Sequence, residues 1–215
     1  MNKIILLGIL SILLASSCKK EEEKTEPSKT ESLNYMPMEI GNYWVYDNYI
    51  IDSLGIERNY NIEDSIIISK DTLINSNTYY KFDNFINKSN HFALYMRDSS
   101  GYIIDNKGVI YLSNTNFTDT LWIRVATANT DTLFTASYKM EQTIESITVP
   151  VGTFNDIVNY RGTIITYNPE NGITNPRYTN NYYAKDIGRV KENSVFLRSN
   201  NILEKRLIKY HINSF

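Results

Sequence analysis

From about residue 33 onward, apolar and polar residues alternate along most of the chain with a period of two. In the segment 120–127, for example, Leu121, Ile123 and Val125 occupy every second position. This period is typical of β-strands with one buried face. No window shows a helical stripe of useful length bounded by capping residues. The pattern therefore predicts an all-β domain.

Runs rich in β-branched and aromatic residues give the expected strands. They cover residues 42–51, 61–69, 78–85, 91–96, 101–105, 108–112, 120–127, 132–140, 142–151, 154–167, 178–185, 188–197 and 203–212. The links between them are short and rich in turn-forming residues, as in DNKG (105–108), NPENG (168–172) and SNN (199–201). Strands at this spacing predict a meander of antiparallel hairpins.

A single long sheet of this kind would leave two edges and one apolar face exposed to water. We therefore expect an antiparallel curved sheet that forms a half-open or closed barrel, with a two-layer β-sandwich as the alternative. The strand pattern continues without a break from residue 34 to residue 215, which predicts one all-β domain over that range.

Composition narrows the classes of partner. The chain has 215 residues, a formal net charge of −2 and one cysteine. A domain of this length buries enough surface to need no disulfide, and a single cysteine offers none. The charge gives no electrostatic reason to expect nucleic acid as a partner.

The N-terminus has the layout of a secretory signal peptide over residues 1–17: a positive start, an apolar run at Ile4–Ala15 and small residues after it. The run is shorter than the roughly 20 residues that a membrane-spanning helix needs. The stretch LLASSC resembles a bacterial lipoprotein signal, which implies cleavage before Cys18 and acyl chains on it. An ordinary signal peptide followed by a free or buried thiol is the alternative.

Residues 18–33 begin with Cys18 and continue as a charged, polar stretch that predicts a disordered tether. The sequence CKKEEE (18–23) resembles the export signal of flavobacterial-type surface lipoproteins. That resemblance implies an outer-membrane protein, anchored by acyl chains, whose domain faces the medium. A domain that faces the periplasm from the same anchor is the alternative.

Three segments of the domain carry a further resemblance. They are GNYWVY (41–46), VPVGTF (149–154) and YAKDIGRVK (183–191). Their order resembles a widespread group of secreted bacterial lipoproteins with the patterns GxxWxY, VPxGTF and YAxxxGxVK. The resemblance brings no known activity. It implies a fold similar to lipoprotein carriers, whose open half-barrel surrounds an apolar groove.

The same three segments have direct physical interpretations. Trp44 is expected to anchor the core where the chain enters the sheet. Pro150 and Gly152 favour a tight turn that tucks Phe154 under the sheet, and Gly188 favours a bulge or corner between two strands. We expect all three segments to define the fold rather than to catalyse a reaction.

Catalytic motifs are absent from the sequence. It contains no phosphate-binding loop, no metal-ligand spacing and no nucleophile elbow, so we expect no cofactor and no metal. His91 and His211 lie in strand-like runs, and rim positions suit them. Aspartates and glutamates are scattered, so an envelope hydrolase with a carboxylate pair is the alternative to a non-catalytic protein. A structural or adhesive surface protein is the third candidate.

Asp followed by Ser or Thr and then an aliphatic residue occurs five times. The hydroxyl residues of these triplets are Ser53, Ser65, Thr72, Thr120 and Thr132. The pattern resembles the O-glycosylation acceptor sequence of the same bacterial group. The alternative is turn chemistry, in which Asp ends a loop, Ser or Thr starts a strand, and the aliphatic residue enters the core.

Tyrosine is abundant, with 17 residues, and its ring suits both sheets and ligand sites. In TYY (78–80) and NYY (181–183) adjacent rings must lie on opposite faces of a strand. The sequence therefore predicts a lipid-anchored module that binds an apolar ligand, a glycan or a protein partner.

Overall fold

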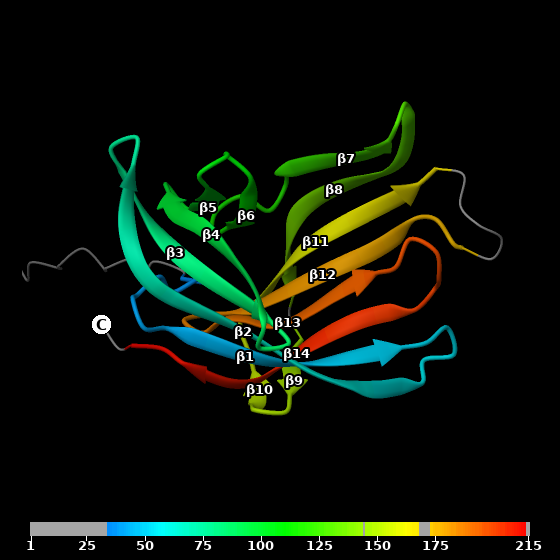
Figure 1. Ribbon diagram of the computed structural model, residues 1–215, viewed down its shortest axis with the longest axis horizontal. Coiled ribbons are helices and arrows are strands. Elements are labelled where there is room, and N and C mark those ends of the chain that lie inside the picture. The colour runs from blue at the N-terminus through cyan, green and yellow to red at the C-terminus, as the bar shows by residue number, and fades with distance from the viewer. Residues whose placement is uncertain (1–33, 144, 168–172, 214–215) are drawn as a thin grey trace, which may run out of the picture. The chain divides into compact units, whose positions relative to one another are not determined.

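Figure 1 shows a computed structural model of the chain, which describes residues 34–143, 145–167 and 173–213. The predicted signal peptide, Cys18 and the tether lie outside the described residues, as does the NPENG turn. Every regular element within the described ranges is a β-strand, which confirms the predicted all-β class.

The strands follow the predicted runs closely. They are β1 (Tyr43–Ile51), β2 (Glu57–Ile74), β3 (Asn77–Ile86), β4 (Asn90–Ser99), β5 (Tyr102–Asp105), β6 (Ile110–Ser113), β7 (Trp122–Ala128), β8 (Asp131–Thr143), β9 (Ile147–Val149), β10 (Gly152–Phe154), β11 (Ile157–Thr166), β12 (Arg177–Ala184), β13 (Gly188–Val195) and β14 (Ile202–His211).

Three of the predicted strands had wrong boundaries. The strand expected at 61–69 extends over Glu57–Ile74, because it pairs with β1 on one side and β3 on the other. The runs 142–151 and 154–167 are divided differently, since a short hairpin of β9 and β10 interrupts them. Pro150 lies in its turn, and Gly152 is the first residue of β10, where it pairs with Val149. The predicted turn is therefore present, but the strands on either side of it are too short to be recognised by a period of two.

Twelve strands form one antiparallel sheet in the order β6-β5-β4-β3-β2-β1-β14-β13-β12-β11-β8-β7. The first and last strands pair at the centre, with Trp44 opposite Tyr210. The two edges, β6 and β7, are successive in the chain. In Figure 1 the two halves of the sheet rise on either side of the central strands.

The sheet curls into a half-open barrel, which confirms the curved sheet expected because a flat one would leave its edges and one apolar face exposed. The hydroxyl of Tyr160 on β11 donates a hydrogen bond of 2.6 Å to the carbonyl of Ile110 on β6. These strands are nine positions apart in the sheet, so only strong curvature brings them together. Register shifts in several strand pairs, including one between Val45 and Tyr46, contribute bends of the kind that β-bulges introduce.

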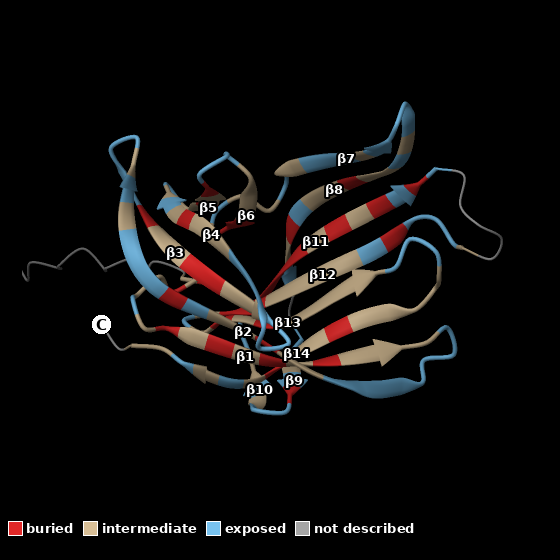
Figure 2. Cartoon of the chain, in the orientation of Figure 1, coloured by how far each residue is buried: buried red, intermediate tan, exposed pale blue. Residues whose placement is uncertain are grey.

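The curvature separates a concave face from a convex one. Along β1, Trp44, Tyr46 and Asn48 are buried on the concave side, while the residues between them are partly exposed. Figure 2 shows the resulting bands of buried residues across the central strands. The alternation predicted from sequence therefore marks the inner and outer surfaces of the barrel wall.

The segments GNYWVY (41–46) and YAKDIGRVK (183–191), which carried the resemblance to secreted lipoproteins, meet at the base of the barrel. The Trp44 indole donates a 2.7 Å hydrogen bond to the carbonyl of Ile187, and the Tyr46 hydroxyl donates one of 2.9 Å to the carbonyl of Arg189. Gly188 has φ +101°, and a Cβ there would lie 3.0 Å from Trp44 Nε1. Trp44, at 2% exposure, is the core anchor that the sequence predicted, and Gly188 forms the corner.

The second segment, the β9-β10 hairpin, packs against the same region. The amide of Val151 donates to the carbonyl of Leu207 on β14, at 3.4 Å. Phe154 meets Tyr210 edge to face, with the ring centroids 6.1 Å apart. Phe154 thus packs beneath the sheet as predicted, and all three segments serve the fold.

Candidate functional site

The concave face of the barrel encloses two adjacent hollows that share Tyr111, Tyr183 and Arg189. The deeper one, here called the apolar lobe, has a volume of about 70 Å³. The other, here called the aromatic lobe, has a volume of about 450 Å³ and is more open. The second volume lies within the range of roughly 300–1,000 Å³ that is typical of small-molecule sites.

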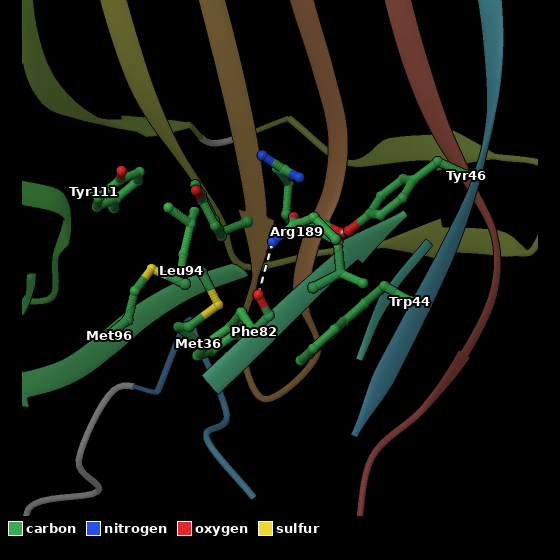
Figure 3. Close-up of a pocket in the computed structure, with 11 residues that line it drawn as sticks. Met36, Trp44, Tyr46, Phe82, Leu94, Met96, Tyr111 and Arg189 are labelled. Carbon is green, nitrogen blue, oxygen red and sulfur yellow. Dashed lines mark hydrogen bonds between the residues drawn. The ribbon is translucent and has the colours of Figure 1, made fainter. Parts of the chain in front are cut away.

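The apolar lobe is lined mainly by hydrocarbon, ring and thioether groups. Met36 comes from the segment before β1, Trp44 from β1, and Phe82, Leu94 and Met96 from the neighbouring hairpin. Figure 3 shows these side chains around the apolar lobe, together with Tyr111 and Arg189, which also line the aromatic lobe. Flexible methionines beside rigid rings suit a lobe that adapts to a hydrocarbon group.

The aromatic lobe is walled by rings from strands far apart in sequence. Tyr138 and Tyr160 stack with their centroids 5.3 Å apart and 19° between their planes, and Trp122 lies in the same wall. Tyr138 fits there because residue 162 is glycine: a Cβ at Gly162 would come within 2.5 Å of its ring. The missing side chain thus makes room for a ring that faces the lobe.

Charge in the aromatic lobe is one-sided. Arg124 and Arg189 line it, and none of the described residues that line it is acidic. Arg124 lies over the ring of Phe134, 5.5 Å from its centroid. Arg189 pairs with Glu192 at 2.5 Å, which leaves Arg124 as the more available cation. The lobe therefore favours a ligand with a negative group and an apolar body.

Three phenols that line the aromatic lobe, those of Tyr111, Tyr160 and Tyr183, stay neutral at physiological pH. Burial raises the pKa of Tyr183 and of Tyr160. Burial, and then the charge of Asp105, raise the pKa of Tyr111 to about 12. The Tyr160 hydroxyl already donates its one hydrogen to the Ile110 carbonyl, and the Tyr111 hydroxyl donates its hydrogen to Asp105 Oδ2. Of these three phenols, Tyr183 is therefore the one that can donate a hydrogen bond to a bound anion.

The paired tyrosines lie on opposite faces as predicted. In NYY, Tyr183 lines the cavity while Tyr182 lines a separate hollow on the convex face. In TYY, Tyr80 packs against the core, whereas Tyr79 lies under Arg97, 5.5 Å from its guanidinium carbon. The NYY pair thus contributes one ring to each of two hollows.

Neither histidine lies in the cavity. His91 is exposed and contacts Asp83 at 2.6 Å. Burial acts to raise the pKa of Asp83, but hydrogen bonds from Lys81, Ser69 and His91 together outweigh it and lower the pKa to about 2. His211 is exposed and stacks on Tyr43, with centroids 5.8 Å apart. Both positions suit the predicted rim role.

The five hydroxyls of the Asp-Ser/Thr triplets are dispersed. Ser53 and Thr120 are exposed outside strands, Thr72 and Thr132 are half-buried in β2 and β8, and Ser65 is half-buried in β2 between β1 and β3. Their modification stays a prediction.

The turn interpretation of these triplets fits only in part. The Asp52 carboxylate accepts hydrogen bonds from the amides of Leu54 and Ile56, which is turn chemistry. Leu54 and Leu73, however, are 83% and 73% exposed, so their aliphatic side chains do not enter the core. Asp64 lies within β2, where it pairs with Lys205 at 2.9 Å, and ends no loop.

Sequence reasoning missed most of the cavity lining. The missed residues include Trp122, Arg124, Tyr138, Tyr160 and Arg189. The alternation at 120–127 predicted a buried face with Ile123 and Val125, and this was wrong: they are 62% and 56% exposed. The opposite face of β7, with Trp122 and Arg124, lines the cavity. Alternation shows which residues share a face of a strand, but not which face is inside. The one available signal in the sequence for an inward-facing charge was Arg124, which lies between the apolar residues Ile123 and Val125.

The described residues form no helix with the length and apolarity needed to cross a bilayer. Among those same residues, no three or more His, Cys, Asp or Glu side chains gather as metal ligands would.

The sequence matches no protein-family model and no curated protein. Two solved structures resemble the domain. One is a candidate lipoprotein of Parabacteroides distasonis, with TM-score 0.48 and 18% identity, covering 84% of this chain and 100% of that one. The other is a candidate exported protein with a YmcC-like fold from Bacteroides fragilis, with TM-score 0.46 and 13% identity, covering 83% and 99%.

Proposed function

We propose that this chain is a non-catalytic binding protein of the cell envelope that takes an anionic amphiphile into its barrel. The observation that carries the proposal is the lining of the aromatic lobe, where rings and two arginines occur with no acidic residue among those described. An apolar body would contact the rings and reach toward the apolar lobe. The negative group would meet Arg124 at the opening.

The N-terminal sequence supports the localisation at the cell envelope that this proposal includes. Acyl chains on Cys18 would anchor the protein at the outer membrane, with residues 19–33 as the tether. Two or three chains give stable anchoring where one does not. An anchored domain would remain close to the membrane, where amphiphiles are concentrated.

The test is a displacement titration with the full chain carrying Cys18→Ser, which removes the acylation site. The probe is 11-(dansylamino)undecanoic acid, whose fluorescence reports entry into an apolar site. Laurate should displace it, and dodecyltrimethylammonium, whose tail is one carbon longer and whose charge is opposite, should displace it at least about tenfold less well. Equal displacement by the two detergents would contradict the anionic preference, and absence of probe binding would reject the site.

Variants locate the binding. Arg124→Gln should weaken laurate displacement about tenfold by removing the cation, and Trp122→Ala should weaken probe binding itself. The matched control is Arg97→Gln, because Arg97 also lies 5.5 Å from a ring centroid but pairs with Tyr79 away from the lobe. If Arg97→Gln weakened displacement as much as Arg124→Gln did, the effect would be one of net charge rather than of the site.

A further inference from the structure

A second hollow lies on the convex face of the barrel wall, over β8, β11 and β12. Its volume is about 520 Å³. Glu141 and Gln142 of β8, Asn159 and Arg161 of β11, and three residues of β12 contribute to its lining, together with Glu145 and Ile147 before and at the start of β9. It is therefore separate from the cavity, on the other side of the same strands.

Two aromatic faces are offered to this hollow. They belong to Tyr178 and Tyr182 of β12. These residues are four positions apart, an even number, so their side chains lie on the same face of the strand. Tyr178 is 41% exposed, and the guanidinium of Arg161 lies 3.9 Å from its ring centroid. The Tyr178 ring and the Arg161 guanidinium stacked on it make a broad, flat and partly polar surface. Such a surface suits the C–H face and the hydroxyl edge of a sugar ring.

Side-chain amides beside the rings are held in fixed planes. Asn159 Nδ2 donates to Asn180 Oδ1 at 2.8 Å, and the Asn159 Oδ1 accepts from the amide of Asn181 at 3.1 Å. Asn180 Nδ2 in turn contacts Asn193 Oδ1 at 3.5 Å. These bonds use one of the two hydrogens on each amide nitrogen. Oriented amides recognise hydroxyls, which both donate and accept.

The charges in the hollow nearly balance. Arg161 Nη1 lies 3.4 Å from Glu141 Oε2, and Lys139 contacts the other oxygen of Glu141 at 3.7 Å. Glu145 adds a second carboxylate to the lining. The Arg161 Nε is buried and has no hydrogen-bond partner among the described residues. A neutral ligand rich in hydroxyls would meet donors and acceptors here, whereas an anion would meet two carboxylates.

From these contacts we infer that the convex hollow is a binding site for a neutral oligosaccharide. A sugar ring stacks on Tyr178 or Tyr182, its hydroxyls bond Asn159, Asn180 and Gln142, and the carboxylates accept further hydroxyl hydrogens. The site is independent of the amphiphile cavity, because the two hollows share no lining residue.

The test is isothermal titration of the full chain carrying Cys18→Ser with maltohexaose, cellohexaose, mannohexaose and xylohexaose. At least one should bind, and Tyr178→Ala should weaken it about tenfold or more. Tyr178 is exposed, so its truncation leaves the core intact, and Tyr182→Ala is the second variant. Binding of none of the four sugars, or tighter binding of a hexamer of galacturonate, would overturn the inference.

The matched control is Tyr49→Ala. Tyr49 also lies on the convex face under an arginine, 4.2 Å from the guanidinium carbon of Arg206, but outside the hollow. Its truncation should leave sugar binding within about twofold. Trp122→Ala, which alters the aromatic lobe, should also leave it unchanged. An equal loss in Tyr49→Ala and Tyr178→Ala would refute the assigned site, while a loss in Trp122→Ala alone would place the sugar in the cavity.

Discussion

At the scale of single residues, one buried side chain holds the beginning and the end of the domain together. Asn42 is fully buried and joins both ends of the domain: its Nδ2 donates to the carbonyl of Pro37 at 3.0 Å, and its Oδ1 accepts from the amide of Asn213 at 2.9 Å. A buried amide bonded on both sides stabilises and also specifies the arrangement.

Gly188 is the residue whose substitution should report most directly on the base of the barrel. Gly188→Ala places a Cβ 3.0 Å from the Trp44 indole, at φ +101°. We expect a loss of about 2–3 kcal/mol in the free energy of unfolding, measured in urea. Gly108→Ala is the control, because its φ is +85° but nothing lies within 4 Å of the added carbon. Equal losses would mean that backbone strain, and not the Trp44 contact, explains the effect.

Asp83 gives a pH-dependent prediction. The pKa of its carboxyl is lowered to about 2 in the folded protein, from an ordinary value of 3.8. A carboxyl whose folded pKa is depressed stabilises the fold above its unfolded pKa, and this stabilisation disappears as pH falls from about 4 to 2. We expect Asp83→Asn to lower the free energy of unfolding by about 1–2 kcal/mol at pH 7 and by much less at pH 2.

Urea unfolding at both pH values tests this prediction. Asp131→Asn, at an exposed position where β8 begins, is the control for loss of one negative charge. A deficit in Asp83→Asn that is as large at pH 2 as at pH 7 would show that the ionised carboxylate is not its source.

At the scale of elements, the β9-β10 hairpin braces the centre of the sheet from outside it. Its three-residue strands are too short to be stable alone, so they depend on contacts with β13 and β14. The hairpin occupies the connection between β8 and β11, two long strands that pair directly. It therefore lets the chain leave the sheet and return beside the strand it left.

Phe154 carries much of this attachment. Phe154→Ala removes the edge contact with Tyr210 and should lower the free energy of unfolding by about 2 kcal/mol, less than a fully buried phenylalanine because the ring is half-buried. Val151→Ala, at an exposed position of the turn, should change it by no more than about 0.5 kcal/mol. Thermal and urea unfolding of the two variants distinguish a brace from a loosely attached hairpin, for which the two losses would be alike.

At the scale of the whole molecule, the predictions of lipid anchoring and of orientation rest on the N-terminal sequence and not on the barrel. Cys18→Ser should abolish incorporation of labelled palmitate and move the protein from the membrane to the soluble fraction. Retention at the membrane without label would contradict lipidation. Protease added to intact cells should digest the wild-type domain if it faces the medium, and should spare it until the outer membrane is broken if it faces the periplasm.

Intact-mass analysis of protein from its native envelope decides between the two interpretations of the Asp-Ser/Thr triplets. Sugars at exposed sites such as Ser53 and Thr120 would add mass beyond sequence plus lipid. A mass equal to sequence plus lipid would exclude glycosylation.

The amino-acid sequence by itself determined most of the strands and the roles of Trp44, Gly188 and Phe154, because two-residue alternation and positive φ are local properties. The full length of β2 and the short strands β9 and β10 depend on their pairing partners. The sequence did not reveal the cavity or the convex hollow. Both depend on which face of each strand turns inward, and a period of two does not show which face that is. Curvature across the sheet brings Tyr160 to Ile110 and Arg124 near Arg189, so tertiary structure alone decided where rings and charges converge.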